Sequence, residues 1–318
     1  MIKLVIEPGV KKTWPQFVRE NPPFSIGIDG YVNAPPNFDP RGPHLNLDHH
    51  KGVDRLATYS TCKQMVLCLN GQLFRSFHKD GVPTGIIFGN DCDQDVWVTD
   101  ALINHHERFV GVRSEPRLRQ LVDVVDLLDT TGGLYLMDIN SRLRKEVNWI
   151  FHPYTEARTA GRLESMTGEQ MVDLVKLGGK RIIDFANGRA GQIEADTRHK
   201  IIHQGDGWVM FEEIGADARC KVCMEGAGAY VMLKKGGNGS RFHYSIGKLS
   251  KFIPFPVQEI IEALNALEGP TVVMEKVHQP TWGGSDIIGG SPRVFGSCLP
   301  PERVIEVTAE IVAKRRVL

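Results

Sequence analysis

Three short segments of the sequence gather side chains that bind divalent cations. Asp29 lies in residues 27–30, the run Asp48-His49-His50 lies in residues 47–51, and three aspartates lie in residues 89–95. Each segment follows a brief apolar run bounded by Gly, Pro or Asn, which is the pattern of a buried strand. Because a parallel sheet opens its binding crevice at the carboxyl ends of its strands, we expect the three segments to converge.

The residue types indicate the chemistry of such a site. Carboxylates and imidazoles without a set of thiolates suit hard to borderline divalent ions, of which Mn²⁺ is expected here and Mg²⁺ is the alternative. Two such ions ~3.5–4 Å apart activate water and hold both oxygens of an in-line phosphoryl displacement. The three segments therefore predict a metal-dependent phosphoesterase.

Two of the three segments also have a structural explanation. Asp29 precedes Gly30, and Asp-Gly is a common turn sequence. The aspartates of residues 91–95 are also compatible with a helix cap and a first helical turn, although three acids in five residues exceed that need. The carboxylate and two imidazoles of residues 48–50 gain nothing from packing at the end of an apolar strand, so this segment carries the hypothesis.

Strands and helices are expected to alternate in the first half of the chain. We expect strands at residues 4–6, 24–28, 44–47 and 85–88, and helices within 53–69, 95–103 and 118–125. This alternation predicts an α/β fold with a mostly parallel sheet flanked by helices.

The length of 318 residues is typical of two domains. We expect a metal-binding catalytic domain at residues 1–145 and a helical linker at 146–190, interrupted by Gly178 and Gly179. Residues 191–318 alternate as strands and end in helices, which predicts a second, smaller α/β domain with a mixed sheet that binds substrate.

Composition limits the partners. Lys and Arg together number 38, as do Asp and Glu, so no long-range field attracts a polyanion and no long duplex nucleic acid is expected. The sequence shows neither an export signal nor an apolar run of the ~20 residues that span a bilayer. With six thinly spread cysteines that favour reduced thiols, these features predict a cytoplasmic protein outside the membrane; its oligomeric state stays open.

Two motifs resemble a known family. The run Leu47-Asp-His-His-Lys51 resembles the signature of the DHH phosphoesterase superfamily, which includes single-strand exonucleases, small-oligonucleotide and cyclic-dinucleotide hydrolases, and manganese pyrophosphatases. The run Trp282-Gly-Gly-Ser-Asp-Ile-Ile-Gly-Gly-Ser-Pro-Arg293 resembles the Gly-rich loop of the associated DHHA1 domain, and Tyr244-Ser-Ile-Gly-Lys248 precedes it as a strand with a basic residue. Together with the linking helix, the resemblance covers most of the chain.

The resemblance implies roles for individual residues. His49 becomes a metal ligand, Asp48 orients the site, and His50 faces the substrate phosphate, where Lys51 helps to neutralise charge. The remaining metal ligands would be Asp29, which bridges two ions, together with Asp91, Asp93 and Asp129.

The sequence departs from the family pattern in three places. The Asp91–Asp93 pair follows the DHH segment instead of preceding it, so either the motif order is altered or Asp91 is the family's later, isolated aspartate. Ile87 stands where the family has a histidine, and the Gly-rich loop has no histidine after its glycines. Substrate binding would then depend on Lys248, Gly283, Gly284, Gly289, Gly290 and Arg293, because glycines let the backbone approach an anion and arginine holds phosphate at two points. A plain flexible turn is the alternative.

The sequence thus predicts hydrolysis of a phosphodiester in a small nucleotide or a short oligonucleotide. Two alternatives stay open. One is a non-catalytic nucleotide-binding protein with the same fold, and the other is a pyrophosphatase or phosphomonoesterase.

Overall fold

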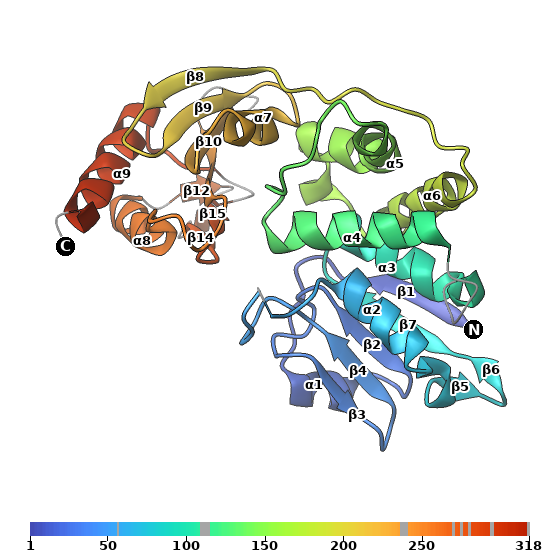
Figure 1. Ribbon diagram of the computed structural model, residues 1–318. Coiled ribbons are helices and arrows are strands. Elements are labelled where there is room, and N and C mark those ends of the chain that lie inside the picture. The colour runs from blue at the N-terminus through green and yellow to red at the C-terminus, as the bar shows by residue number, and fades with distance from the viewer. Residues whose placement is uncertain are drawn as a thin grey trace. The chain divides into compact units, whose positions relative to one another are not determined.

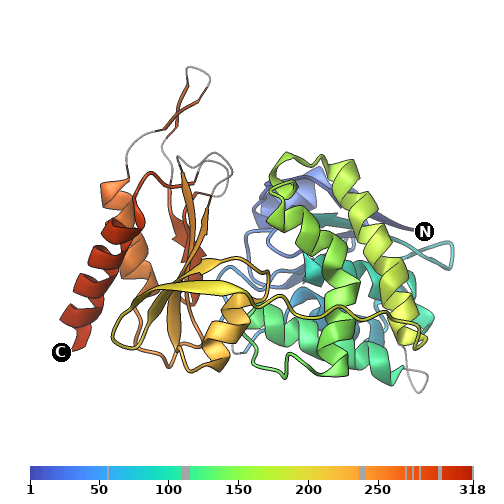
Figure 2. The ribbon, with the colours of Figure 1, turned by 90° about the horizontal axis from the view of Figure 1, so that it is seen from above.

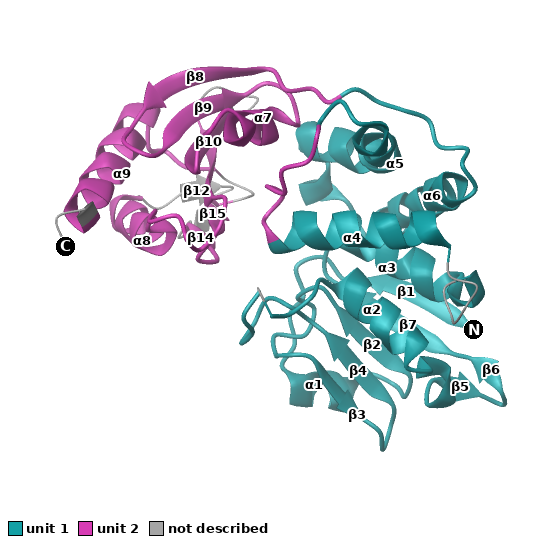
Figure 3. Cartoon of the chain, in the orientation of Figure 1, with its two compact units in different colours: residues 1–130, 139–194 teal, residues 131–138, 195–318 magenta. Residues whose placement is uncertain are grey.

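The structure is a computed structural model that describes residues 1–55, 57–108, 115–235, 241–268, 271–273, 276–278, 281–292 and 296–316. Internal contacts divide the chain into two compact units (Figure 3). Unit 1 comprises Met1–Thr130 and Ile139–Glu194, and unit 2 comprises Thr131–Asp138 and Ala195–Leu318. This division differs from the expected boundaries at residues 145 and 190, because the helices expected to form a linker pack within unit 1.

The elements of unit 1 are the strands β1 Ile2–Ile6, β2 Ser25–Ile28, β3 Asn37–Asp39, β4 His44–Leu47, β5 His78–Lys79, β6 Val82–Pro83 and β7 Gly85–Gly89, and the helices α1 Trp14–Glu20, α2 Thr61–Asn70, α3 Gln94–Asn104, α4 Pro116–Thr130, α5 Arg142–Thr159 and α6 Gly168–Ala186. Those of unit 2 are β8 His199–Gln204, β9 Val209–Glu213, β10 Ala229–Lys235, β11 Phe242–Lys248, β12 Thr271–Val273, β13 Lys276–His278, β14 Gly283–Gly284 and β15 Ile288–Gly290, with α7 Ala218–Met224, α8 Val257–Leu267 and α9 Pro301–Arg316.

Unit 1 is built on a five-stranded sheet in the order β1-β7-β2-β4-β3 (Figure 1). The first four strands run parallel, and only the edge strand β3 is antiparallel. All four positions of β2 and of β4 are buried, the polar Ser25, His44 and Asn46 included, as expected for central strands of a sheet that is covered on both faces. The predicted α/β fold with a mostly parallel sheet is confirmed.

Helices cover both faces of this sheet. Phe17 of α1 is fully buried against Tyr31, Val32 and Phe88 on one face. On the other face, a Cβ at Gly85 would contact Ile103 of α3, and α2 packs beside α3. Because the helices cover the faces of the sheet, the residues that follow the parallel strands lie at its edge, beyond the carboxyl ends of the strands.

Two helices differ from the sequence prediction. The first begins at Thr61 and not near residue 53, because its first free N–H groups are bonded by carboxylates that are distant in the sequence. The second, α6, runs through Gly178 and Gly179 without interruption. A Cβ at Gly178 would lie 1.8 Å from a ring atom of Trp97, so this glycine permits close packing of α6 on α3.

Unit 2 is the expected second domain with a mixed sheet. Its six strands follow the order β14-β15-β11-β10-β9-β8, and β9 and β10 form the parallel pair. One face packs on α8 and α9, which lie side by side in Figure 2. The opposite face carries α7, where Phe211 and Tyr230 are fully buried.

Among the helices of the described residues, none combines the length and the apolar character that crossing a membrane requires.

Candidate metal centre

The site begins where β2 and β4 end. The two strands pair in parallel with Ile28 opposite Leu47, so Asp29 and Asp48 leave the sheet at the same edge. Asp29 has a left-handed backbone (φ 45°), which aspartate tolerates better than most residues, and Gly30 continues the turn. The side chain of Asn90, after β7, donates a 2.9 Å hydrogen bond to the Gly30 carbonyl and ties the third strand end to this turn.

Asp48 organises the backbone of the turn that carries the two histidines. Its buried carboxylate accepts hydrogen bonds from the backbone N–H groups of Gly30 at 3.0 Å, of His50 at 3.1 Å and of Lys51 at 3.1 Å. The same carboxylate lies 3.0 Å from Nδ1 of the His50 ring. These contacts fix the direction of His50, and the role of Asp48 in a reaction stays a prediction.

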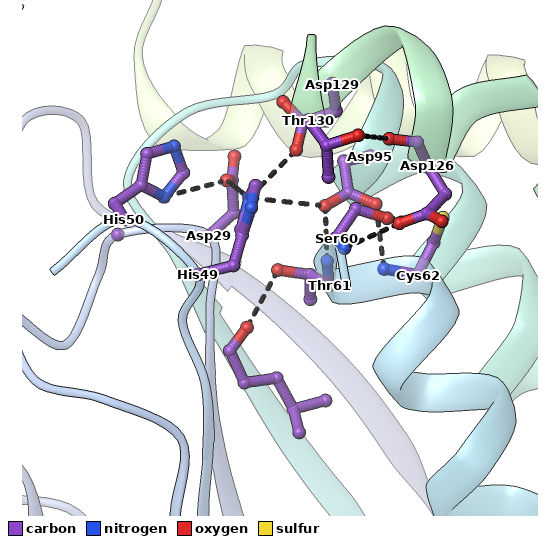
Figure 4. A network of polar contacts seen from close by, with 12 residues as sticks. Asp29, His49, His50, Ser60, Thr61, Cys62, Asp95, Asp126, Asp129 and Thr130 are labelled. Atoms are coloured by element: carbon purple, nitrogen blue, oxygen red, sulfur yellow. Dashed lines mark hydrogen bonds and ion pairs between the residues drawn. The ribbon is translucent and has the colours of Figure 1, made fainter. Parts of the chain in front are cut away.

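The His49 ring is fully buried and meets three carboxylates (Figure 4). Its Nε2 atom lies 2.9 Å from Asp129 Oδ2, 3.4 Å from Asp29 Oδ1 and 3.9 Å from Asp95 Oδ2. The three acids come from the end of β2, the first turn of α3 and the last turn of α4. Segments up to 100 positions apart in the sequence therefore meet at one imidazole nitrogen.

Two overlapping sets of residues in the described part of the chain have the spacing of metal ligands. One set is Asp29, His49 and His50, and the other is His49, Asp95 and Asp129. Within each set, one ligand atom from each residue lies within 4.8 Å of the others. The structure thus brings Asp29, His49 and Asp129 together and adds His50, which sequence reasoning placed on the substrate phosphate.

Asp95 is the member of the cluster that sequence reasoning did not include among the ligands. Its carboxylate accepts 2.7 Å hydrogen bonds from the backbone N–H groups of Thr61 and Cys62, the first two residues of α2. Asp126 of α4 accepts a 2.7 Å hydrogen bond from Ser60 N–H in the same way. The one sequence signal was that Asp95 is the third acid of its segment, more than a single helix cap requires.

Asp91 and Asp93 lie beside the cluster but belong to neither set of ligands. Asp93 caps α3 by accepting hydrogen bonds from the N–H groups of Asp95 at 3.0 Å and Val96 at 3.2 Å. Asp91 accepts one from Cys92 N–H at 2.7 Å. The structure therefore shows the capping interaction that was the alternative for this segment, and metal binding by Asp91 and Asp93 stays a prediction.

Burial and the crowded carboxylates together set the pKa values of the cluster. Desolvation and the charges of Asp129 and Asp29 raise the pKa of Asp95 to about 7. Desolvation and the charges of Asp29, Asp129, Asp91 and Asp95 raise the pKa of Asp93 well above its ordinary value. Burial opposes the charged form of His49, but its carboxylate neighbours raise its pKa to about 11. Burial acts against ionised Asp29 too, yet the two histidines and Arg55 lower its pKa overall.

Two buried atoms of the cluster lack a hydrogen-bond partner. They are His49 Nδ1 and Asp129 Oδ2, although the latter lies 2.9 Å from His49 Nε2 in a contact without hydrogen-bond geometry. Three carboxylates beside one imidazole also leave net negative charge in a largely buried place, which is costly without a cation. The donor set of carboxylate oxygens and imidazole nitrogens therefore fits a divalent ion.

The expected substrate-binding residues of unit 2 have structural surroundings of their own. A Cβ at Gly284, Gly289 or Gly290 would come within 2.2–2.4 Å of a neighbouring atom, so the contacts among β11, β14, β15 and α8 account for these glycines. Gly283 has open space around it. Lys248 donates a 3.3 Å hydrogen bond to the Ile253 carbonyl, and Arg293 lies outside the described residues. Binding of substrate by this region stays a prediction.

Among the comparisons with known proteins, only the one with solved structures gives a match. No protein-family model matches the sequence, and no curated protein matches it. A solved structure described as a pGpG-specific phosphodiesterase, PggH from Vibrio cholerae, is similar over 69% of this chain and 73% of its own. The identity is 10% and the TM-score is 0.33, so the assignment of function depends on the side chains of the site.

Proposed function

We propose that this chain is a divalent-metal-dependent phosphoesterase that hydrolyses a phosphodiester of a small nucleotide or short oligonucleotide. The observation that supports it best is the convergence of Asp29, Asp95 and Asp129 on the buried Nε2 atom of His49. Structural capping explains one of these acids, Asp95, but leaves Asp29 and Asp129 without an equivalent role.

The residues that would hold the ions are Asp29, His49, Asp95 and Asp129, with His50 at the exposed side of the first set. The two sets have separate carboxylates, which suits two ions, and His49 Nε2 with its single lone pair would ligate one of them. When bound, Mn²⁺ or Mg²⁺ supplies the positive charge and the activation of water that phosphoryl transfer needs.

The protein's own residues provide substrate contacts around this cluster. The His50 side chain is 41% exposed, and because its Nδ1 faces Asp48, its Nε2 is the ring atom left for substrate. From this position Nε2 would contact a phosphate oxygen or the leaving oxygen. Lys51 is exposed directly beside it and adds a second positive charge.

The substrate class follows from charge and not from contacts. A chain with 38 basic and 38 acidic residues gains little from counterion release, so a small nucleotide or short oligonucleotide is favoured over long nucleic acid. The two rivals keep part of the same site. A nucleotide-binding protein would bind without turnover, and a pyrophosphatase or phosphomonoesterase would release free phosphate.

The test is a phosphodiesterase assay with Mn²⁺ on bis(p-nitrophenyl) phosphate and on a dinucleotide. We expect turnover by the wild type, loss of turnover in His49→Ala, and unchanged turnover in the control His78→Ala, which replaces an exposed histidine of β5. Metal analysis of both variants should show loss of Mn²⁺ from the first only.

The products separate the rivals. Release of mononucleotides supports a phosphodiesterase, and release of free phosphate from pyrophosphate or a monoester supports the second rival. Binding of the dinucleotide with no turnover at any metal concentration would replace the enzyme with a binding protein.

A further inference from the structure

Arg55 is a cation beside the cluster that the site described above does not use. It lies in the loop between the two histidines and α2, and its Nη1 atom donates a 3.2 Å hydrogen bond to the backbone carbonyl of Asp129. Asp129 is the residue whose carboxylate lies 2.9 Å from His49. The guanidinium is therefore bound to the backbone of a candidate metal ligand.

The bond to the Asp129 carbonyl uses few of the hydrogen-bond donors of Arg55. A guanidinium has five N–H donors in a planar fork, and this contact occupies one of them. Among the described residues, no carboxylate forms an ion pair with Arg55, although its charge contributes to the low pKa of Asp29. An arginine that only capped the last turn of α4 would need neither a position close to Asp29 nor several N–H donors.

Placement and donor geometry together indicate an anion. Arginine binds phosphate oxygens through two parallel N–H groups, and its charge persists at any physiological pH. An anion that binds both the metal ions of the cluster and the guanidinium of Arg55 needs some oxygens for the ions and others for the N–H groups of the arginine. A phosphate group has this property.

We propose that Arg55 binds the non-bridging oxygens of the substrate phosphate and stabilises the negative charge that grows on them during hydrolysis. The inference rests on the proposed function, because it assigns Arg55 to the phosphate of that same reaction. The bond to the Asp129 carbonyl then serves to position the fork, and the remaining donors contact the substrate.

The experiment compares Arg55→Ala and Arg55→Lys with wild type, and uses Arg41→Ala as the matched control. Arg41 pairs with Asp39 on β3 and its side chain is 90% exposed. The first measurement is calorimetric binding of inorganic phosphate to the Mn²⁺-loaded protein. We expect the Kd to rise about 10- to 100-fold in Arg55→Ala, less in Arg55→Lys, and not at all in Arg41→Ala.

The second measurement is kinetic. We expect kcat/KM on the dinucleotide to fall about 100-fold in Arg55→Ala, and added guanidinium ion to restore part of the activity to this variant alone. A residue that acted only by capping α4 would change thermal stability and would not respond to guanidinium.

The outcomes separate the two hypotheses. If wild type binds phosphate and Arg55→Ala binds it with the same Kd, the role of Arg55 is wrong whatever the turnover. A wild type that binds no phosphate in the presence of Mn²⁺ also rejects it. If Arg55→Ala weakens phosphate binding while wild type hydrolyses no ester, the anion site stands and the proposed hydrolase activity fails.

Discussion

Two regions that attract attention in the sequence differ in what explains their residues. In the acid and histidine cluster of unit 1, two buried atoms, Asp129 Oδ2 and His49 Nδ1, have no hydrogen-bond partner among the described residues. The Gly-rich segment of unit 2 is explained almost entirely by its neighbours, because Cβ atoms at Gly284, Gly289 and Gly290 would overlap backbone or side-chain atoms. An unsatisfied buried group indicates a missing ligand, whereas a sterically required glycine indicates packing.

The largest effect should come from removing one carboxylate of the cluster. Asp29→Asn keeps the left-handed backbone, which asparagine also tolerates, but removes the charge. We expect kcat/KM with Mn²⁺ to fall roughly 10²–10³-fold. The matched control is Asp80→Asn, since Asp80 also has positive φ (52°) but is exposed. Equal activity of both variants would remove the cluster from the reaction.

Metal should stabilise unit 1 and leave unit 2 unchanged. At a concentration about 100 times its Kd, Mn²⁺ is expected to add about 2.7 kcal/mol to the stability of the unit that binds it. Hydrogen exchange read by mass spectrometry should show slower exchange in α2 and in residues 29–48, with no change in β11, and chelation should reverse the effect. Slower exchange confined to unit 2 would contradict the assignment of the metal site to unit 1.

Asp100, a buried acid outside the cluster, shows how much a buried carboxyl group costs in stability when no metal is involved. Burial raises the pKa of Asp100 in α3 to about 6, against an ordinary value of 3.8. The folded state thus holds a proton that the unfolded state has lost, so stability declines as pH rises from about 4 to about 6 and stays lower above that. Asp100→Asn removes this dependence and should raise the free energy of unfolding at pH 8 on the order of 2 kcal/mol.

Urea denaturation at pH 4 and pH 8 measures this effect, and Mn²⁺ should not alter the difference between Asp100→Asn and wild type. If Mn²⁺ did alter it, Asp100 would belong to the metal-binding region.

The smallest effects should separate packing from binding in unit 2. A Cβ at Gly290 would lie 2.4 Å from the Tyr244 carbonyl, so Gly290→Ala should destabilise unit 2 by about 1–2 kcal/mol. Gly283→Ala meets no atom within 4 Å and should change stability by less than about 0.5 kcal/mol. Should Gly283→Ala weaken nucleotide binding while stability is unchanged, the segment has a binding role as the resemblance implies.

Much of unit 1 could be predicted from local pattern. The apolar runs of β2, β4 and β7 end at polar residues, and parallel strands place their carboxyl ends together, so the meeting of Asp29 with Asp48 and His49 followed from sequence. The adjacent imidazoles at 49 and 50 had no packing explanation, and the structure places them beside the same carboxylate, Asp29.

The choice among the other acids was made by tertiary structure. Asp91, Asp93 and Asp95 are equivalent as sequence, yet Asp95 reaches both the first turn of α2 and His49, while Asp93 caps its own helix. Asp129 lies in the last turn of a helix, and the family resemblance included it among the expected ligands although its own neighbourhood in the sequence does not distinguish it. Distances between helices depend on packing, such as the contact that Gly178 permits with Trp97, and no local pattern encodes them.

Sequence by itself therefore determined the residue types and the strand ends that bring cation ligands to one edge of a sheet. Tertiary structure decided that Asp95, and not Asp91 or Asp93, joins Asp29 and Asp129 around His49, because helix packing sets the positions of these carboxylates to within a few ångströms. Ligand binding depends on separations at that scale, whereas the spacing of apolar residues specifies only which face of an element is buried.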